Sequence, residues 1–343
     1  MELFRYNKPF ELESGEVLPS LDIAYHTYGS LSDKKDNCIW VCHALTADSD
    51  VKGWWPHTVE KGRFLDPEKY FIVCANIIGS CYGSTGPLST NEKTGKPWYE
   101  KFPRLTVRDI VRAHILLANH LGLDKIHSLI GSSVGGFQAI EWAVEQPDRF
   151  DSLVLIATDA IASPWAVALD ETQRMAIFSD KTYGMPSPEA GQKGLAAARA
   201  IGLLSYRGPS GYNASQQNII GSEEEMFPKH RAVTYQQYQG KKLIDRFNVY
   251  SYVVILDMFD THNVGRDRGG IDNALKRLNM PVLNVGITTD LIFSPQEIRA
   301  LTDKIPGAVY QEIDSAFGHD GFLVEHEKLN KLIQEFFNNI KTN

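Results

Sequence analysis

The sequence has no excess of positive charge and no long hydrophobic run. Its 35 lysine and arginine residues are outnumbered by 42 aspartate and glutamate residues, which gives a formal net charge of −7 at pH 7. Because nucleic-acid binding needs a concentrated basic face, this balance argues against a nucleic-acid partner. No run of 18 apolar residues occurs, so we expect no membrane-spanning helix. The charged N-terminal stretch MELFRYNKPFELESGE lacks the apolar segment of a secretory leader.

Cysteine is also scarce, and its spacing is not that of metal ligands. Cys38, Cys42, Cys74 and Cys81 all lie within the first 81 residues, and no C-x-x-C pair occurs. Three of them fall in strand-like or glycine-rich apolar stretches. We therefore predict buried free thiols in a reducing compartment, rather than a disulfide or a metal site. This favours a cytoplasmic protein that holds no metal.

What the sequence does have is a regular alternation of two hydrophobic patterns. Hydrophobic residues make up 43% of the chain, and 343 residues suffice for one large core with an insertion. Strand-like apolar patterns, alternating over 21–29 and mostly continuous elsewhere, predict strands near 21–29, 38–45, 70–79, 126–130, 152–160, 280–290 and 308–315. Helical spacing of apolar residues predicts helices near 107–123, 137–144 and 326–340. Buried strands separated by helices indicate an α/β fold, with a mostly parallel central sheet and helices on both faces.

The pattern of residue types along the chain changes after about residue 162. From 163 to 270 there is little strand signal and much alanine, glutamine, arginine and methionine, divided by turn signals such as YGMPSP and GRDRGG. After residue 270 the apolar runs typical of strands resume. We interpret 1–162 and 271–343 as one core domain, interrupted by a helical cap, or lid, over 163–270.

The stretch HSLIGSSVGGFQAIEW at 127–142 places two serines between a strand signal and a helix signal. A strand that turns sharply into a helix needs small neighbours around its exposed residue, which is the nucleophile-elbow pattern G-x-S-x-G. Only Gly131, Ser133 and Gly135 fit this pattern, because Ser132 would require glycine where Ile130 and Val134 stand. Ser133 is therefore the candidate nucleophile.

A serine hydroxyl needs a base, and the base needs an orienting acid. In the α/β-hydrolase fold, which this pattern resembles, the acid and then the histidine follow the serine along the chain. His319, in SAFGHDGFL, comes directly after the last predicted strand and is the candidate base. Asp290 ends the preceding predicted strand and is the candidate acid, although a helix-capping role before LIFSPQEIR is the alternative.

The oxyanion of an acyl-transfer intermediate needs two backbone N–H donors. One should be Val134 N–H, directly after the nucleophile and at the start of a helix. The second should come from HALTAD at 43–48, after an early buried strand. We assign it to Leu45, with Ala44 or Thr46 as alternatives.

With these residues in place, the chain resembles the homoserine O-acetyltransferase family of the α/β-hydrolase superfamily over nearly its full length. The resemblance rests on several separate motifs in the right order: VCHALTAD, NIIGSCYGSTGP, FPRLTVRDIVRA, GSSVGGFQAIEW, SPWAVALDETQRMAI, GLLSYRG, DLIFSP and GHDGFL. Two departures stand out. The family often has glycine and methionine where this chain has Ser132 and Val134, and commonly reads YRS where this chain reads YRG at 206–208.

The resemblance implies a ping-pong reaction with acetyl-CoA as co-substrate and no bound cofactor. Ser133 would take the acetyl group, and the hydroxyl of L-homoserine would then receive it, as a step of methionine biosynthesis. Arg207 would hold the carboxylate of homoserine and Asp320 its amino group. Family members are commonly homodimers joined through the cap, a role that SYVVILDMF at 251–259 would suit as well as it would suit burial.

Other functions use the same serine, histidine and aspartate. A homoserine O-succinyltransferase or a serine O-acyltransferase would differ only in a few pocket side chains, since one methylene changes binding by about 1–3 kcal/mol. An esterase or thioesterase would use water as the acceptor. Arg207 and Asp320 favour an amino-acid acceptor, because a hydrolase needs no such pair.

Overall fold

The computed structural model describes residues 1–220 and 226–342. An eight-stranded sheet lies at its centre, in the order β1-β4-β6-β5-β9-β10-β13-β14. The six strands from β6 to β14 are parallel, and β4 pairs antiparallel with both β6 and β1. The strands of this sheet are β1 (Glu2–Tyr6), β4 (Leu21–Tyr28), β5 (Cys38–Cys42), β6 (Phe71–Ala75), β9 (Ser128–Ser132), β10 (Leu153–Ile156), β13 (Val282–Ile287) and β14 (Val309–Ile313). The predicted mostly parallel α/β sheet is confirmed.

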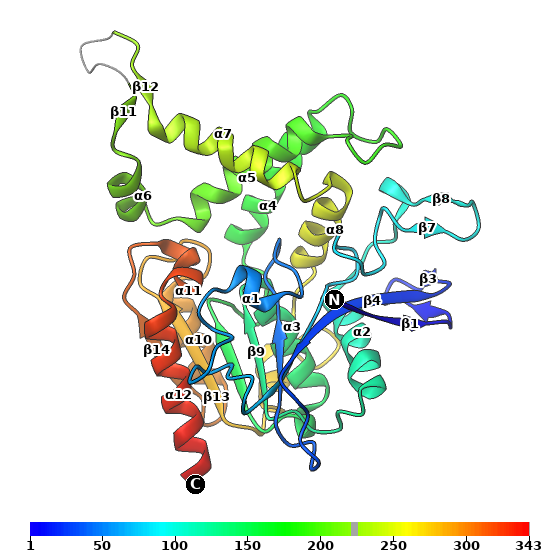
Figure 1. Ribbon diagram of the computed structural model, residues 1–343, viewed down its shortest axis with the longest axis vertical. Helices are drawn as coiled ribbons and strands as arrows, with labels where there is room; N and C mark the ends of the chain where they lie inside the picture. The colour runs from blue at the N-terminus through cyan, green and yellow to red at the C-terminus, as the bar shows by residue number, and fades with distance from the viewer. Residues whose placement is uncertain (221–225, 343) are drawn as a thin grey trace.

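Helices cover both faces of this sheet (Figure 1). On one face lie α2 (Val107–His120), α3 (Val134–Glu145) and α10 (Pro295–Lys304). On the other lie α12 (His326–Thr342) and the segment that follows α1 (Val51–Trp54). Each layer buries its own apolar cluster against the sheet, so the core is two apolar layers separated by the strands.

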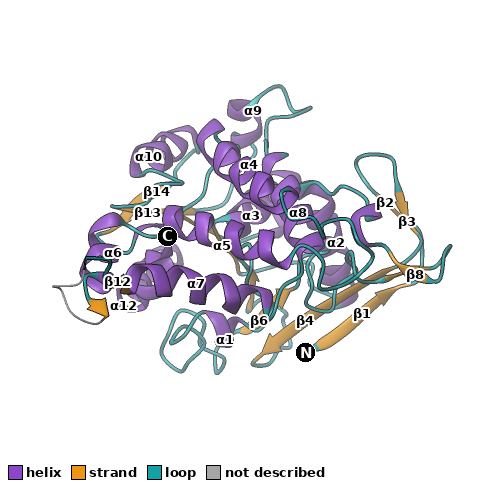
Figure 2. Ribbon diagram, turned by 90° about the horizontal axis from the view of Figure 1, so that it is seen from above, coloured by secondary structure: helices purple, strands orange, loops and turns teal. Residues whose placement is uncertain are grey.

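A group of helices sits beyond the carboxyl ends of the parallel strands, at the top of Figure 1. Its members are α4 (Pro164–Phe178), α5 (Gln192–Tyr206), α6 (Pro209–Gln216), α7 (Arg231–Ile244) and α8 (Val249–Asp260). Seen from above in Figure 2, α5 crosses between α4 and α7. These helices fall inside the range predicted for the cap, although the division of the chain into core and cap stays a prediction.

Short elements complete the chain. The remaining strands form three two-stranded pairs: β2 (Phe10–Glu11) with β3 (Val17–Leu18), β7 (Thr90–Asn91) with β8 (Lys96–Pro97), and β11 (Ile219–Ile220) with β12 (Lys229–His230). The remaining helices are the α-helices α9 (Ile271–Leu275) and α11 (Gly321–Val324) and the 3₁₀ turns Tyr99–Lys101, Pro147–Arg149 and Gly318–Asp320.

Local sequence explains where two of these helices, α4 and α10, begin. Ser163 caps α4 by accepting the N–H of Ala166, and Pro164 stands at the first helical position, where its missing N–H costs nothing. Ser294 and Glu297 form a reciprocal capping box at the start of α10. Asp290 therefore does not cap this helix.

The two ends of the segment that carries α4 to α8 lie side by side. Ile161 and Asn263 form an isolated antiparallel bridge. Next to it, Ala162 N–H donates to the carbonyl of His262 and Val264 N–H donates to the carbonyl of Ala160, both at 3.0 Å. Residues 160–162 and 262–264, which flank the group of helices α4 to α8, are thus held together by backbone hydrogen bonds.

The stretch SYVVILDMF is part of α8 and is mostly buried within its own chain. Its buried members include Tyr252, Ile255, Leu256 and Met258, all at 1% exposure or less. Of the two roles that the sequence left open for this stretch, the structure shows burial.

Candidate active site

The segment around Ser133 has the shape of a nucleophile elbow. Ser133 stands between β9 and α3 with φ 55° and ψ −128°, a conformation that non-glycine residues rarely adopt. Its N–H donates to the carbonyl of Ile156 at 3.0 Å, and its own carbonyl accepts the hydroxyl of Thr158 at 2.9 Å. These bonds to β10 and the residues after it hold the strained turn in place.

The glycine after the elbow is required by a close approach. A Cβ at Gly135 would lie 2.1 Å from the carbonyl oxygen of Cys42, so only glycine lets α3 pack against the end of β5. This packing brings Ser133 next to the segment that follows β5. Residues 44 to 48 of that segment line the same cavity as Ser133.

The two serines of the elbow have different surroundings. Ser132 is the last residue of β9 and is 1% exposed, and in the described part of the chain its hydroxyl has no hydrogen-bond partner. Ser133 is half-buried and faces the cavity. This placement agrees with the register that assigns Ser133 as nucleophile.

His319 and Asp290 meet at the cavity floor. His319 Nδ1 lies 2.7 Å from Asp290 Oδ2, and the other oxygen, Oδ1, accepts the N–H groups of Ile292 and Phe293 at 2.8 and 3.1 Å. Both carboxylate oxygens are therefore engaged, which fixes the orientation of the imidazole. Because Nδ1 carries the proton that faces Asp290, Nε2 is left as the acceptor.

The environment of His319 favours its protonated form. Burial alone would lower the pKa of His319, but the charge and hydrogen bond of Asp290, with a further contribution from Asp320, outweigh it and raise the pKa above its ordinary value. A proton accepted by this imidazole is thus stabilised.

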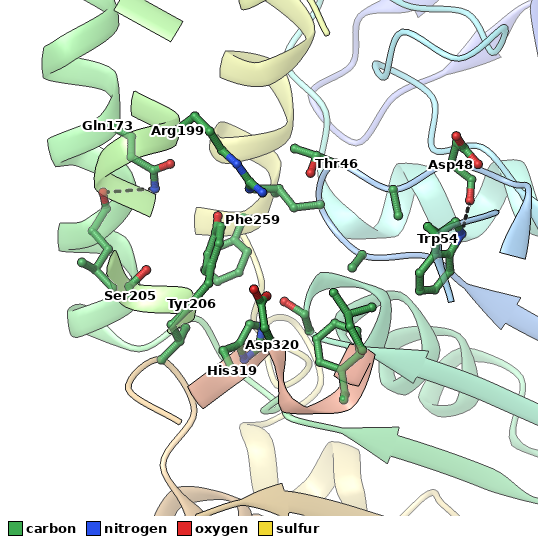
Figure 3. Close-up of a pocket in the computed structure, with 18 of the residues that line it drawn as sticks. Thr46, Asp48, Trp54, Gln173, Arg199, Ser205, Tyr206, Phe259, His319 and Asp320 are labelled. Carbon is green, nitrogen blue, oxygen red and sulfur yellow. Dashed lines mark hydrogen bonds between the residues drawn. The ribbon is translucent and has the colours of Figure 1, made fainter. Parts of the chain in front are cut away.

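The cavity above these residues has a volume of about 530 Å³ and lies between the core and the helices α4, α5 and α7. Figure 3 shows Arg199, Ser205 and Tyr206 projecting toward it from α5, with His319 and Asp320 below them and Thr46 across from them. Gln173 joins them from α4. Ser133 and Leu45, both predicted from the sequence, also line it.

The structure places the two predicted substrate-binding residues differently. Asp320 lines the cavity, whereas Arg207, at the C-terminus of α5, is not among the lining residues. Arg207 Nε lies 3.0 Å from Asp320 Oδ2, an ion pair that is not aligned as a hydrogen bond. Burial raises the pKa of Asp320, and Arg207 is the largest influence that opposes this rise.

The arginine of α5 that does line the cavity is Arg199, which the sequence reasoning missed. Its guanidinium lies 5.5 Å from the ring centroid of Tyr206, seven residues later on the same face of α5. A spacing of seven residues places two side chains on one face of a helix, so the pair could have been noticed in GLAAARAIGLLSYRG.

The departure from the family pattern at position 208 has a local reason. A Cβ at Gly208 would lie 2.6 Å from the carbonyl oxygen of Ala316 and 2.9 Å from Thr289 Oγ1. The loop that carries His319 thus passes directly against the end of α5. Glycine at this position permits the approach that brings Arg207 to Asp320.

His43 is a structural residue of this region. It is fully buried, its Nε2 accepts the N–H of Ile77 at 3.1 Å, and its Nδ1 lies 2.9 Å from the carbonyl of Ala44. Burial lowers its pKa to about 4, so the ring is neutral and both nitrogens are satisfied. His43 thereby holds the start of the loop that contains Leu45.

Sheet order, elbow and the Asp290–His319 pair define an α/β-hydrolase. In agreement, residues 38–193 match the family model described as alpha/beta hydrolase fold. The acetyl esterase MekB is similar in structure, with a TM-score of 0.84 over 98% of this chain and 96% of that one, at 23% identity. This likeness shows the fold alone.

Closer relatives identify the family within that class. The homoserine O-acetyltransferase of Cyclobacterium marinum is 45% identical over 98% of this chain and 95% of its own length. The crystal structure of homoserine O-acetyltransferase from Staphylococcus aureus is 31% identical, with a TM-score of 0.80 over 98% of this chain and 94% of that one. The chain belongs to the homoserine O-acetyltransferase family, a family of acyltransferases.

Proposed function

We propose that this protein transfers an acetyl group from acetyl-CoA to the hydroxyl of L-homoserine. The observation that carries the proposal is that one cavity holds Ser133 and His319 together with a cation, Arg199, and an anion, Asp320. The first two residues suit acyl transfer, and the charged pair suits an α-amino acid. Family membership supports the same reaction.

In the first half-reaction, His319 Nε2 takes the hydroxyl proton of Ser133 while Oγ bonds to the thioester carbon. The carbon–sulfur bond breaks, CoA leaves as a thiol with the proton from His319, and an acyl-serine remains. The backbone N–H groups of Val134 and Leu45 stabilise the negative charge on the carbonyl oxygen.

In the second half-reaction, the homoserine hydroxyl gives its proton to His319 and attacks the acyl carbon. The bond to Ser133 Oγ breaks, and Oγ recovers the proton. The same base works twice, and Asp290 holds it in one tautomer throughout. O-acetyl-L-homoserine is released, and the enzyme returns to its starting state.

The acceptor is held by its two charged groups. Arg199 binds the carboxylate, because it is the arginine of α5 that lines the cavity, and charge-assisted pairing of this kind is strong. Asp320 binds the ammonium group. Arg207 takes the different role of holding Asp320 in position through their 3.0 Å ion pair.

The expected homodimer and cytoplasmic location also belong to this proposal. Helix α8 is buried within the chain, so a dimer would use other side chains of the cap. Leu204 on α5 and Val233 and Tyr238 on α7 are exposed by 50–58% and support such an interface. No helix in the described part of the chain is long and apolar enough to cross a bilayer.

Thiol release from acetyl-CoA tests the reaction directly. It is measured with L-homoserine, with L-serine and with no acceptor, and then with succinyl-CoA as the donor. We expect rapid release only with acetyl-CoA and homoserine together. Equal release without an acceptor would make the protein a thioesterase, and preference for serine or for succinyl-CoA would assign it to the corresponding alternative.

A further inference from the structure

The cavity has a buried end and an exposed end. Asp170 and Gln173 line the buried end at 7% and 1% exposure. Lys242 and Arg246, on and just after α7, also line the cavity but are themselves exposed to solvent. The elongated donor must place its thioester at Ser133 while its other end reaches outward, and the exposed end is where it can do so.

The two cations at the exposed end are Lys242, near the end of α7, and Arg246, two residues beyond that helix. Arg246 is already engaged: it donates to the carbonyl of Thr46 and to the hydroxyl of Tyr82, with a further bond to Thr46 Oγ1 at 3.3 Å. Its guanidinium is therefore fixed against the loop after β5. Among the described residues, no carboxylate lies within ion-pair distance of Lys242, whereas the neighbouring Lys241 pairs with Asp245 at 3.1 Å.

Two carboxylates also line the cavity, on the segment that follows β5. Asp48 accepts the N–H of Asp50 at 2.8 Å, and Asp50 accepts the hydroxyl of Tyr28 at 2.6 Å. Their negative charge disfavours an anion on that wall. An anionic group that enters the mouth is thus directed toward the cations of α7.

We propose that Lys242 binds the phosphate groups of the acyl-CoA nucleotide at the exposed end of the cavity, beside the fixed guanidinium of Arg246. The inference rests on the proposed acetyl-CoA donor and adds the residue that distinguishes this donor from simpler thioesters. Phosphates are costly to bury and pair well with an ammonium group at the rim. Partly buried Arg199 serves the acceptor, and exposed Lys242 serves the donor.

The test compares two donors and two lysines. S-acetylpantetheine keeps the thioester and its arm but lacks the nucleotide and its phosphates. Lys242→Gln should raise the KM for acetyl-CoA about fivefold, the upper end for an exposed ion pair, and leave kcat unchanged. It should not change the KM for S-acetylpantetheine. Lys241→Gln removes the same charge one residue away, outside the cavity, and should leave both donors unaffected.

Two results would overturn the inference: an unchanged KM for acetyl-CoA in Lys242→Gln, or an equal rise for both donors. The wild-type protein is assayed first with acetyl-CoA and homoserine. Activity there, combined with an unaffected Lys242→Gln variant, would remove only the role of Lys242. Absence of wild-type activity with acetyl-CoA would remove the proposed function as well.

Discussion

At the scale of single residues, the left-handed backbone of Ser133 matters most, because it turns one serine of an adjacent pair toward the cavity and leaves the other in the strand. The strain is held by bonds to Ile156 and Thr158 on the neighbouring strand and its following loop. On the proposed assignment, backbone direction decides which serine reacts, since the two side chains are chemically identical.

The two serines should respond differently to alanine. Ser133→Ala should abolish the acyl-enzyme and lower kcat roughly a thousandfold or more, because the nucleophile is lost. Ser132→Ala removes a buried hydroxyl that has no partner among the described residues, so activity should stay within about threefold. Intact-protein mass spectrometry after mixing with acetyl-CoA detects the acetyl adduct. An adduct on Ser133→Ala but not on Ser132→Ala would reverse the assignment.

At the scale of elements, α5 connects the cavity to the loop that carries His319 and Asp320. Its middle presents Arg199 to the cavity, and its end presents Arg207 to Asp320, beside the base. Packing of α5 between α4 and α7 decides which side of the helix faces inward (Figure 2). A shift of α5 would therefore move Arg199 and Arg207 together.

Substitution of the two arginines separates their roles. Arg199→Gln should raise the KM for homoserine roughly 10- to 100-fold, because hydrogen bonds between charged groups contribute about 1.5–3 kcal/mol. Arg207→Gln should raise it by less than about tenfold, since it only loosens Asp320. Neither change should slow acetylation of the enzyme by acetyl-CoA in single-turnover assays. A larger effect at Arg207 would support the assignment made from the sequence.

Elements with a strong apolar signal could be predicted from the sequence, and the site only in part. The seven predicted strands are β4, β5, β6, β9, β10, β13 and β14. Six are shorter than the predicted run because the run continues into a loop, and β9 has the predicted length but begins two residues later. Strand β1 at the sheet edge was missed, since Glu2 and Arg5 interrupt any apolar pattern. The seven-residue spacing of Arg199 and Tyr206 could be read from the sequence, but which face of α5 points inward is decided by tertiary packing, which sequence periodicity does not contain.

At the scale of the whole molecule, a network of charges joins distant parts of the chain. Glu13, between β2 and β3, pairs with Arg266 at 2.7 Å and with Arg108 of α2 at 3.0 Å. Arg108 also contacts Glu141 of α3, which in turn binds Arg268. The N-terminal hairpin, two core helices and the segment that follows α8 are thereby held together.

This network predicts a loss of stability in acid. Partial burial opposes ionisation of Glu13, but hydrogen bonds and charge from Arg266 lead the influences that lower its pKa to about 2, from an ordinary 4.5. A lowered folded-state pKa stabilises the fold above about pH 4.5, and this contribution disappears as pH falls toward 2.

Glu13→Gln should therefore lower the thermal midpoint at pH 7 and flatten its dependence on pH between these values. The pH at which half of the variant is unfolded in acid should rise by roughly half a pH unit, because the variant is the less stable protein. Thermal unfolding followed by circular dichroism at a series of pH values checks this. Parallel curves for the variant and the parent protein would show that other carboxylates govern acid unfolding.

The antiparallel bridge between Ile161 and Asn263 has an evolutionary consequence. Because Ile161 and Asn263 lie side by side, the stretch between them can mutate or be replaced as a unit without changing the strand order of the sheet. Arg199 and Lys242 would travel with that piece, while Ser133 and Asp290 would stay behind. Descendants of one ancestral hydrolase could in this way acquire new acceptors and donors on an inherited catalytic platform.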